Sequence, residues 1–113
     1  MLAHVELAPR AERDLCSLQK PDRARIITSL RSLEDVPPAE NLDIRPLTGR
    51  PGIMRLRVGD WRILYRPLGE YECNRLVLER GVLEGTPALL VMRIVNRRDL
   101  ERAIRALEIP EID

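Results

Sequence analysis

The sequence predicts an α+β domain in which an N-terminal strand and an αα-hairpin pack on one face of an antiparallel β-sheet, and a further helix ends the chain. Three patterns lead to this prediction. Apolar residues recur at helical spacing in two segments before residue 36, they alternate with arginines in two short segments after residue 53, and they recur at helical spacing again near the C-terminus. A length of 113 residues fits one domain, residues 1–113.

The first third of the chain is expected to form a strand and two helices. Residues 2–7 alternate sufficiently for a strand, and Pro9 suits the first turn of a helix, where its missing N–H is not needed. That helix ends near Pro21, which begins the second helix for the same reason. Apolar stripes support both helices: Ala11, Leu15 and Leu18 in the first, and Ile26, Leu30 and Leu33 in the second. Residues 36–46 hold three prolines without an apolar period, so we expect a loop there.

A β-hairpin is the sharpest local prediction of the sequence. The segments MRLRV and WRILY flank Gly59 and Asp60, and glycine at the first central position fits a type II′ turn. A two-residue turn puts three apolar pairs on one face: Val58 opposite Trp61, Leu56 opposite Ile63, and Met54 opposite Tyr65. We therefore expect Trp61 and Tyr65 to face the core rather than to stack on bases.

The last third of the chain contains a strand and a helix with clear patterns, after a segment that has none. Residues 88–95 are apolar on both sides, as in an inner strand. Residues 96–107 repeat apolar positions at helical spacing. Between residues 68 and 87, Arg75–Arg80 is a candidate for an additional strand, and the sequence leaves the topology open. We expect this segment to extend the sheet edge or to form a protruding hairpin away from the arginines.

The second face of the predicted hairpin is cationic. Arg55 and Arg57 lie on one strand, and Arg62 lies directly opposite Arg57, although facing like charges destabilise a sheet. Arg97 and Arg98 follow the last strand, so a sheet that brings this strand beside the hairpin adds one or both to the same surface. The three hairpin arginines together favour a polyanion site. Each one alone is better explained as a solvated arginine, or as a partner of Glu70, Glu72 or Asp99.

Other compositional features exclude several classes of function. The single histidine, His4, lies in the first strand, where a structural or surface role is favoured over catalysis. Cys16 and Cys73 are far apart, so we expect two free, buried thiols and no metal or cofactor. The chain shows no apolar run of the ~18 to 20 residues needed to span a membrane and no secretory pattern at its N-terminus. These features predict a cytoplasmic protein without a membrane partner.

Four segments of the chain resemble the RelE/ParE superfamily of bacterial toxins from type II toxin–antitoxin systems. They are LAPRAERDLCSL, PDRARIITSLRSLED, PLTGRPGIMRLRVGDWRILYR and IVNRRDLERAI. The resemblance covers nearly the whole chain and implies the RelE/ParE-like microbial RNase fold. It is closer to RelE-like messenger-RNA interferases, in which basic residues occupy the positions of Arg55, Arg57, Arg62 and Arg97.

In those interferases the basic residues surround the scissile phosphate of mRNA on the ribosome, and the ribose 2′-hydroxyl attacks its own 3′-phosphate. The resemblance therefore implies a metal-independent endoribonuclease that inhibits translation. Its catalytic arginines would be Arg57, Arg62 and Arg97, and its RNA contacts would be Arg55, Arg57 and Arg98. Glu101 is a candidate base by its own chemistry, although a solvated helix glutamate is the better explanation for it. Many active relatives have His at the position of Asn96 and Tyr at that of Glu101, so the general acid and base are not assigned.

Two alternatives to the nuclease remain open. ParE-like relatives with the same fold poison DNA gyrase, and a decayed member would only bind its antitoxin. Either toxin class implies a cognate antitoxin in a hetero-oligomer, with a short acidic and apolar segment that covers the basic face or displaces the last helix. The identity of the antitoxin, the codon preference and ribosome dependence are left open by the sequence.

Overall fold

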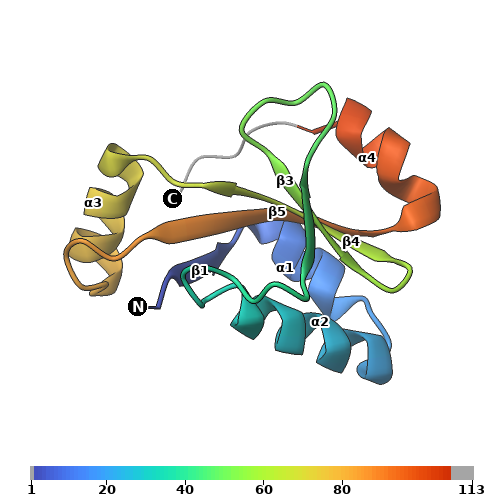
Figure 1. Ribbon diagram of the computed structural model, residues 1–113, viewed down its shortest axis with the longest axis horizontal. Helices are drawn as coiled ribbons and strands as arrows, with labels where there is room; N and C mark the ends of the chain where they lie inside the picture. The colour runs from blue at the N-terminus through green and yellow to red at the C-terminus, as the bar shows by residue number, and fades with distance from the viewer. Residues whose placement is uncertain (1, 108–113) are drawn as a thin grey trace.

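A computed structural model describes residues 2–107 of the chain as a sheet flanked by helices (Figure 1). In chain order the elements are β1 (His4–Leu7), α1 (Pro9–Cys16), α2 (Lys20–Ser32), β2 (Asp43–Pro46), β3 (Met54–Val58), β4 (Trp61–Pro67), α3 (Glu70–Arg80), β5 (Ala88–Asn96), the 3-10 helix η1 (Arg97–Asp99) and α4 (Leu100–Arg105). The predicted α+β class is confirmed.

The sheet has the strand order β1-β5-β4-β3-β2 in the described part of the chain. Three of its neighbouring pairs are antiparallel, whereas β1 and β5 run parallel with His4 opposite Ala88. The prediction of an antiparallel sheet therefore holds for β2 to β5 only. Almost the whole chain connects β1 to β5, which leaves ample length for the crossover that a parallel pair needs.

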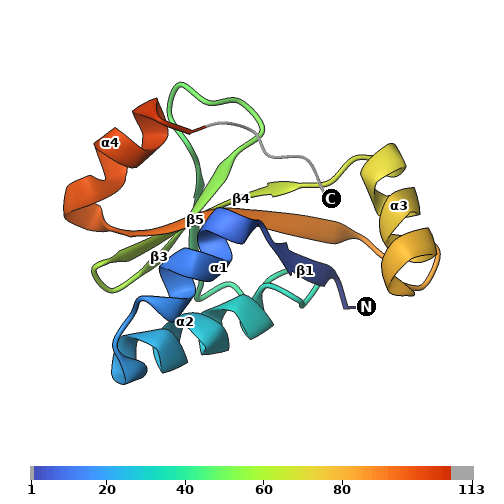
Figure 2. The ribbon, with the colours of Figure 1, turned by 180° about the vertical axis from the view of Figure 1, so that it is seen from behind.

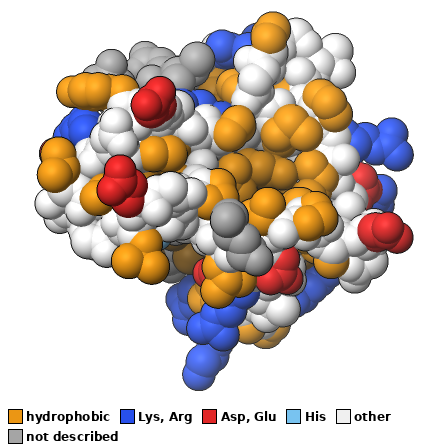
Figure 3. Space-filling model, turned by 60° about the vertical axis from the view of Figure 1, so that its left-hand side comes forward, with side chains coloured by type: hydrophobic (Ala, Val, Ile, Leu, Met, Phe, Trp, Pro, Cys, Tyr) orange, Lys and Arg blue, Asp and Glu red, His pale blue; other side chains and the backbone are white. Residues whose placement is uncertain are grey.

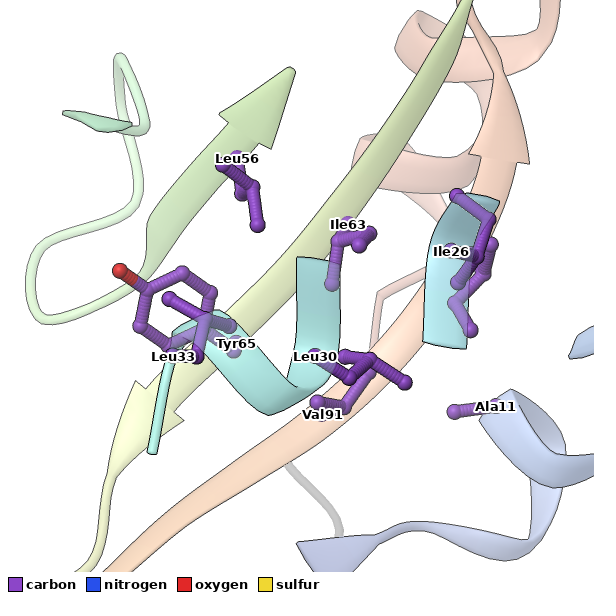
Figure 4. Packing of buried hydrophobic residues seen from close by; sticks show 9 residues of the cluster. Ala11, Ile26, Leu30, Leu33, Leu56, Ile63, Tyr65 and Val91 are labelled. Atoms are coloured by element: carbon purple, nitrogen blue, oxygen red, sulfur yellow. The ribbon is translucent and has the colours of Figure 1, made fainter. Parts of the chain in front are cut away.

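The αα-hairpin covers one face of the sheet, as predicted (Figure 2). Ile26 and Leu30 of α2, together with Leu33 at its C-cap, pack against apolar side chains of the sheet, which include Leu56, Ile63, Tyr65 and Val91 (Figure 4). The predicted hairpin register is confirmed at all three apolar pairs. Gly59 has a φ of 58° and no non-glycine residue among 2–107 has a positive φ, as a type II′ turn at Gly59-Asp60 requires.

The last helix covers the opposite face. Leu100 and Ile104 pack against a second core that contains Leu64, Met92 and Leu107. The predicted helix over 96–107 is shorter in the structure, because residues 97–99 form η1 and the α-helix starts only at Leu100. The first predicted helix is also shorter and ends at Cys16.

One predicted loop contains a strand. Asp43–Pro46, inside the expected loop of residues 36–46, pairs with β3 at the sheet edge, with Asp43 opposite Arg57. Four residues are too few for the strand period to stand out, and a proline at the end of an edge strand removes no ladder hydrogen bond.

The segment that follows β4 is a helix, so the predicted extra strand or hairpin at this position is wrong. Gly69 precedes α3 and donates its N–H to Glu72 Oε1 at 3.3 Å, Arg75 pairs with Glu79 one turn later, and Gly81 ends the helix in the left-handed conformation, with φ 68°. The sequence does not show a helical period of apolar residues in this segment, because α3 buries few side chains and Leu76 is its one fully buried residue.

The position of α3 agrees with the sequence-based expectation. It lies at the end of the sheet away from the β3–β4 turn (Figures 1 and 2). Tyr71, Leu78 and Leu83 are exposed in and after this helix, and Figure 3 shows apolar side chains gathered on this side of the molecule. None of the helices in residues 2–107 is long and apolar enough to span a bilayer.

Candidate nucleic-acid interface

The hairpin carries its arginines on the face turned away from α1 and α2. Leu56 and Ile63 are fully buried against α2, so the alternation along the strands turns Arg55 and Arg57 to the other side. Arg62 pairs directly with Arg57 across the ladder. The predicted like-charge pair is therefore present.

Arg62 is buried, in contrast to its expected place on an exposed surface. The residue is only 8% exposed, and its Nη1 donates to the carbonyl oxygens of Gly59 at 2.8 Å and Trp61 at 3.0 Å. Burial lowers the pKa of Arg62, and the positive charges of Arg57, Arg55 and Arg97 lower it further. These four guanidinium groups thus form one electrostatic cluster, hereafter the arginine cluster, in which Arg62 also supports the turn.

Arg97 joins the cluster because β5 runs beside β4. Trp61 pairs with Asn96, and the next backbone N–H, that of Arg97, donates to the carbonyl of Asp60 at 2.7 Å. The Arg97 side chain remains 65% exposed and lies 3.6 Å from the Asp60 carboxylate. The predicted approach of Arg97 to the hairpin is present in the structure.

A groove of about 570 Å³ lies between the hairpin and the last helix. One wall consists of β2, β3 and the loop after β2, and the other consists of α4. Its polar lining residues are Asp43, Arg45, Thr48, Arg55, Arg57 and Glu101. We call it the arginine groove. The structure thus brings Glu101 to the same groove as Arg55 and Arg57.

Sequence reasoning missed Arg45 as a lining residue. It belongs to β2, which was expected to be loop, and the run Asp43-Ile44-Arg45 is too short to show that two polar side chains alternate toward one face. Pairing with β3 places Arg45 directly opposite Arg55.

The carboxylates in and near the groove leave one cation without a partner. Asp43 lies 3.4 Å from Arg55 and 3.5 Å from Arg45. Arg57 is exposed, and no described carboxylate lies within ion-pair distance of it. The partners considered from sequence bind elsewhere: Glu72 pairs with Arg66, and Asp99 with Arg102.

Arg98 and Asn96 do not line the arginine groove. Arg98 lines a second groove with Arg10 and Trp61, on another side of η1. Trp61 is half-buried and packs on the core, as predicted, while part of it borders this second groove. Asn96 caps η1, because its side-chain oxygen accepts the N–H of Arg98 at 3.2 Å. A capping role explains an asparagine here.

The remaining candidate residues lie apart from the arginines. His4 contacts Glu6 at 2.7 Å. Both cysteines are free, but Cys16 is exposed, so its expected burial is wrong because α1 turns it to solvent. Residues 2–107 contain no group of three or more histidine, cysteine or acidic side chains that could hold a metal ion.

This arrangement can bind a phosphate and stabilise a growing negative charge. Arg57 presents unpaired donors, and Arg55, Arg62 and Arg97 raise the positive potential around it. The Glu101 carboxylate on the facing wall can accept a proton.

The chain is similar to known toxins in sequence and fold. A family model described as the ParE toxin of the type II toxin–antitoxin system, parDE, matches residues 5–79. No curated protein sequence gives a significant match.

Solved structures of related fold include two complexes and one free toxin. The RelBE2 toxin–antitoxin complex from Mycobacterium tuberculosis is 20% identical with a TM-score of 0.57, covering 86% of this chain and 100% of that one. The archaeal RelE–RelB complex from Pyrococcus horikoshii is 23% identical with a TM-score of 0.58, covering 86% and 97%. A double arginine-to-alanine mutant of Escherichia coli RelE in the free state is 14% identical with a TM-score of 0.58, covering 96% and 100%. At these identities the likeness shows the fold alone.

Proposed function

The chain belongs to the ParE toxin family of type II toxin–antitoxin systems, and we propose that it acts as a toxin that cuts messenger RNA in the arginine groove. The observation that carries this proposal is Arg57, an exposed guanidinium with no described carboxylate partner, which shares a groove with Glu101. Guanidinium groups bind phosphate through two parallel donors and remain charged at neutral pH.

The proposed reaction is an internal transfer of the phosphate. Glu101 takes the proton of a ribose 2′-hydroxyl, and the 2′-oxygen forms a bond to phosphorus of the adjacent 3′-phosphate. The bond from phosphorus to the 5′-oxygen of the next nucleotide breaks, and this oxygen takes a proton from water. The products are a 2′,3′-cyclic phosphate and a 5′-hydroxyl end, and no metal or cofactor takes part.

The arginines stabilise the negative charge that develops on the phosphorane. Arg57 supplies exposed donors inside the groove. Arg62 and Arg97 do not line the groove; both contribute positive charge to the cluster, and Arg62 also holds the turn that carries both strands. Fixed donors of this kind need no reorganisation during the reaction. Asn96 caps η1 and has no ordinary acid–base chemistry, which is why the role of base falls to Glu101.

The proposed partners follow from the same surface. The substrate is mRNA on the ribosome, in the cytoplasm. A cognate antitoxin would neutralise the toxin in a hetero-oligomer by laying an acidic and apolar segment over the arginine groove. The presence of toxin–antitoxin complexes among the similar structures supports such a partner.

A ParE-like gyrase poison is the second candidate, and one observation favours it. The family model that matches the chain is that of ParE rather than RelE. A gyrase poison needs a docking surface but no general base, so this candidate assigns no role to Glu101.

The two candidates are separated by measuring both outcomes in the same induced cells. Primer extension detects cut transcripts, and trapped gyrase–DNA adducts detect double-strand breaks. If the protein is a nuclease, we expect cut transcripts with the wild type and intact transcripts with Glu101→Gln. Arg31→Ala, a control at an exposed position of α2, should cut transcripts like the wild type. DNA breaks with intact transcripts would support the gyrase poison. Unimpaired growth at high expression without an antitoxin would contradict both and leave a member that only binds its antitoxin.

A further inference from the structure

One arginine outside the cluster ties the loop between β2 and β3 to the end of the last helix. Arg50 Nη2 donates to the backbone oxygens of Ile104 and Leu107, at 2.8 Å each. The side chain is half-buried, so both hydrogen bonds are partly protected from water. Hydrogen bonds with a charged donor are the stronger class.

The loop holds Arg50 in a fixed place. Leu47 N–H donates to the Ile53 carbonyl at 2.9 Å, which closes the loop. Within the loop, Arg50 N–H donates to the Leu47 carbonyl at 3.3 Å, and the Arg50 carbonyl accepts the Ile53 N–H at 3.2 Å. Gly49 and Gly52 take positive φ values of 77° and 83°, which allow the two tight bends. Leu47 and Ile53 are themselves buried in the core that contains Leu107.

The last helix depends on contacts of this kind. The α-helical part of α4 is six residues long, and a helix this short is not stable by itself in water. It ends at Arg105, with Ala106 rather than a glycine as its C-cap. Leu107 N–H donates to the Ile104 carbonyl at 3.2 Å, and Arg50 adds a second, charged donor to that carbonyl and one to the carbonyl of Leu107. A cation at the C-terminal end also interacts favourably with the helix dipole.

The two elements that Arg50 joins are the two walls of the arginine groove. The loop wall contributes Leu47 and Thr48, and the helix wall contributes Glu101 and Ile104. Ile104 both lines the groove and accepts one of the two hydrogen bonds. A change at Arg50 therefore acts on the separation of the walls without removing any side chain that lines the groove.

We propose that Arg50 is a positioning residue, which clamps α4 against the β2–β3 loop and so holds Glu101 at its place opposite Arg57. The consequence for catalysis rests on the proposed function. The clamp itself does not.

Hydrogen exchange tests the clamp without reference to activity. Arg50→Met keeps much of the aliphatic stem and removes the donors, Arg50→Lys keeps a cationic donor, and Arg105→Ala removes an exposed charge at the same helix end. In peptides that cover residues 100–107 we expect at least roughly tenfold faster exchange in Arg50→Met, because both hydrogen bonds to the end of the helix are lost. Arg50→Lys should lie between Arg50→Met and wild type, and Arg105→Ala, which removes only an exposed cation near the helix end, should lie much closer to wild type than Arg50→Met does. Unchanged exchange in Arg50→Met, or equal acceleration in Arg105→Ala, would overturn the clamp.

Kinetics with a short mRNA bound to ribosomes, the proposed substrate, test the positioning role. The groove arginines remain in Arg50→Met, so we expect KM to stay within about threefold, whereas kcat falls roughly tenfold and recovers in part in Arg50→Lys. Faster exchange together with an unchanged kcat would overturn the positioning role. If the wild type cuts no RNA while Arg50→Met still loosens α4, the proposed function is wrong and the clamp is right.

Discussion

Replacing Arg57 with methionine should impair the toxin and stabilise its fold at the same time. The residue faces Arg62 across the ladder, and its charge lowers the pKa of that buried guanidinium. Arg57 has no ion-pair partner among the described carboxylates. Its removal therefore relieves the repulsion between Arg57 and Arg62 without breaking an attraction that would offset this gain. Cross-strand like-charge pairs cost about 0.2 to 1 kcal/mol. In a domain of this size that relief raises the melting temperature by about 1 to 4 °C.

The loss of function should be much larger than the gain in stability. A donor that touches the phosphate in the transition state contributes ~10²-fold or more to the rate. The assay pairs single-turnover cleavage of a short ribosome-bound mRNA with thermal melting, for Arg57→Met and for Arg45→Met. Arg45 is the matched control, because it lines the same groove and lies 3.5 Å from Asp43.

Salt separates the electrostatic explanation from a packing one. Repulsion between partly exposed charges is screened at high ionic strength, so the stability gain of Arg57→Met should shrink at ~1 M NaCl. A variant that melts earlier than wild type and cleaves RNA at the wild-type rate would refute the reasoning, because Arg57 would then be a structural residue.

Three further changes test the hairpin and α3. Arg62→Met should destabilise the fold, because loss of a charged donor to two backbone carbonyls costs about 1 to 3 kcal/mol and outweighs the relieved repulsion with Arg57; chemical denaturation shows whether the free energy of unfolding falls. Gly59→Ala should melt several degrees earlier, since φ is 58° and a Cβ would lie 2.7 Å from Arg25 Nη2. In Glu72→Gln the melting temperature should become less dependent on pH in acid. The hydrogen bond with Arg66 lowers the pKa of Glu72 in the folded protein below 4.5, its value in the unfolded chain. The ionised carboxylate therefore stabilises the fold fully above pH 4.5, and this contribution is lost as the pH falls through the lower folded pKa.

Local patterns predicted the hairpin and the αα-hairpin because each contains its own check. The two-residue turn fixes every cross-strand partner in the hairpin. The register is correct only if the apolar residues of both strands then share one face, and they do so from Val58 to Tyr65. No such check exists for β2, which has four residues, or for α3, whose exposed Tyr71 and Leu78 obscure the helical period.

The candidate site was predictable to the extent that it lies on the hairpin. Arg55, Arg57 and Arg62 follow from the register, and Arg97 follows once β5 lies beside β4. The burial of Arg62 was not predictable, because it depends on how its guanidinium folds back onto the turn. Arg45 depends on an unrecognised strand, and Arg98 depends on the direction in which η1 turns.

The parallel pairing of β1 with β5 determines how late in folding the arginine cluster is completed. The first strand finds its partner only at Ala88 and beyond, and the arginine cluster is complete only when Arg97 has followed β5. Contacts between such distant residues form late, because a long loop has to close first. A nascent chain that has not reached Arg97 therefore lacks both the finished sheet and the last cation of the cluster. The strand that closes the sheet also brings in the last cation, so only the folded sheet presents the full positive charge of the arginine cluster.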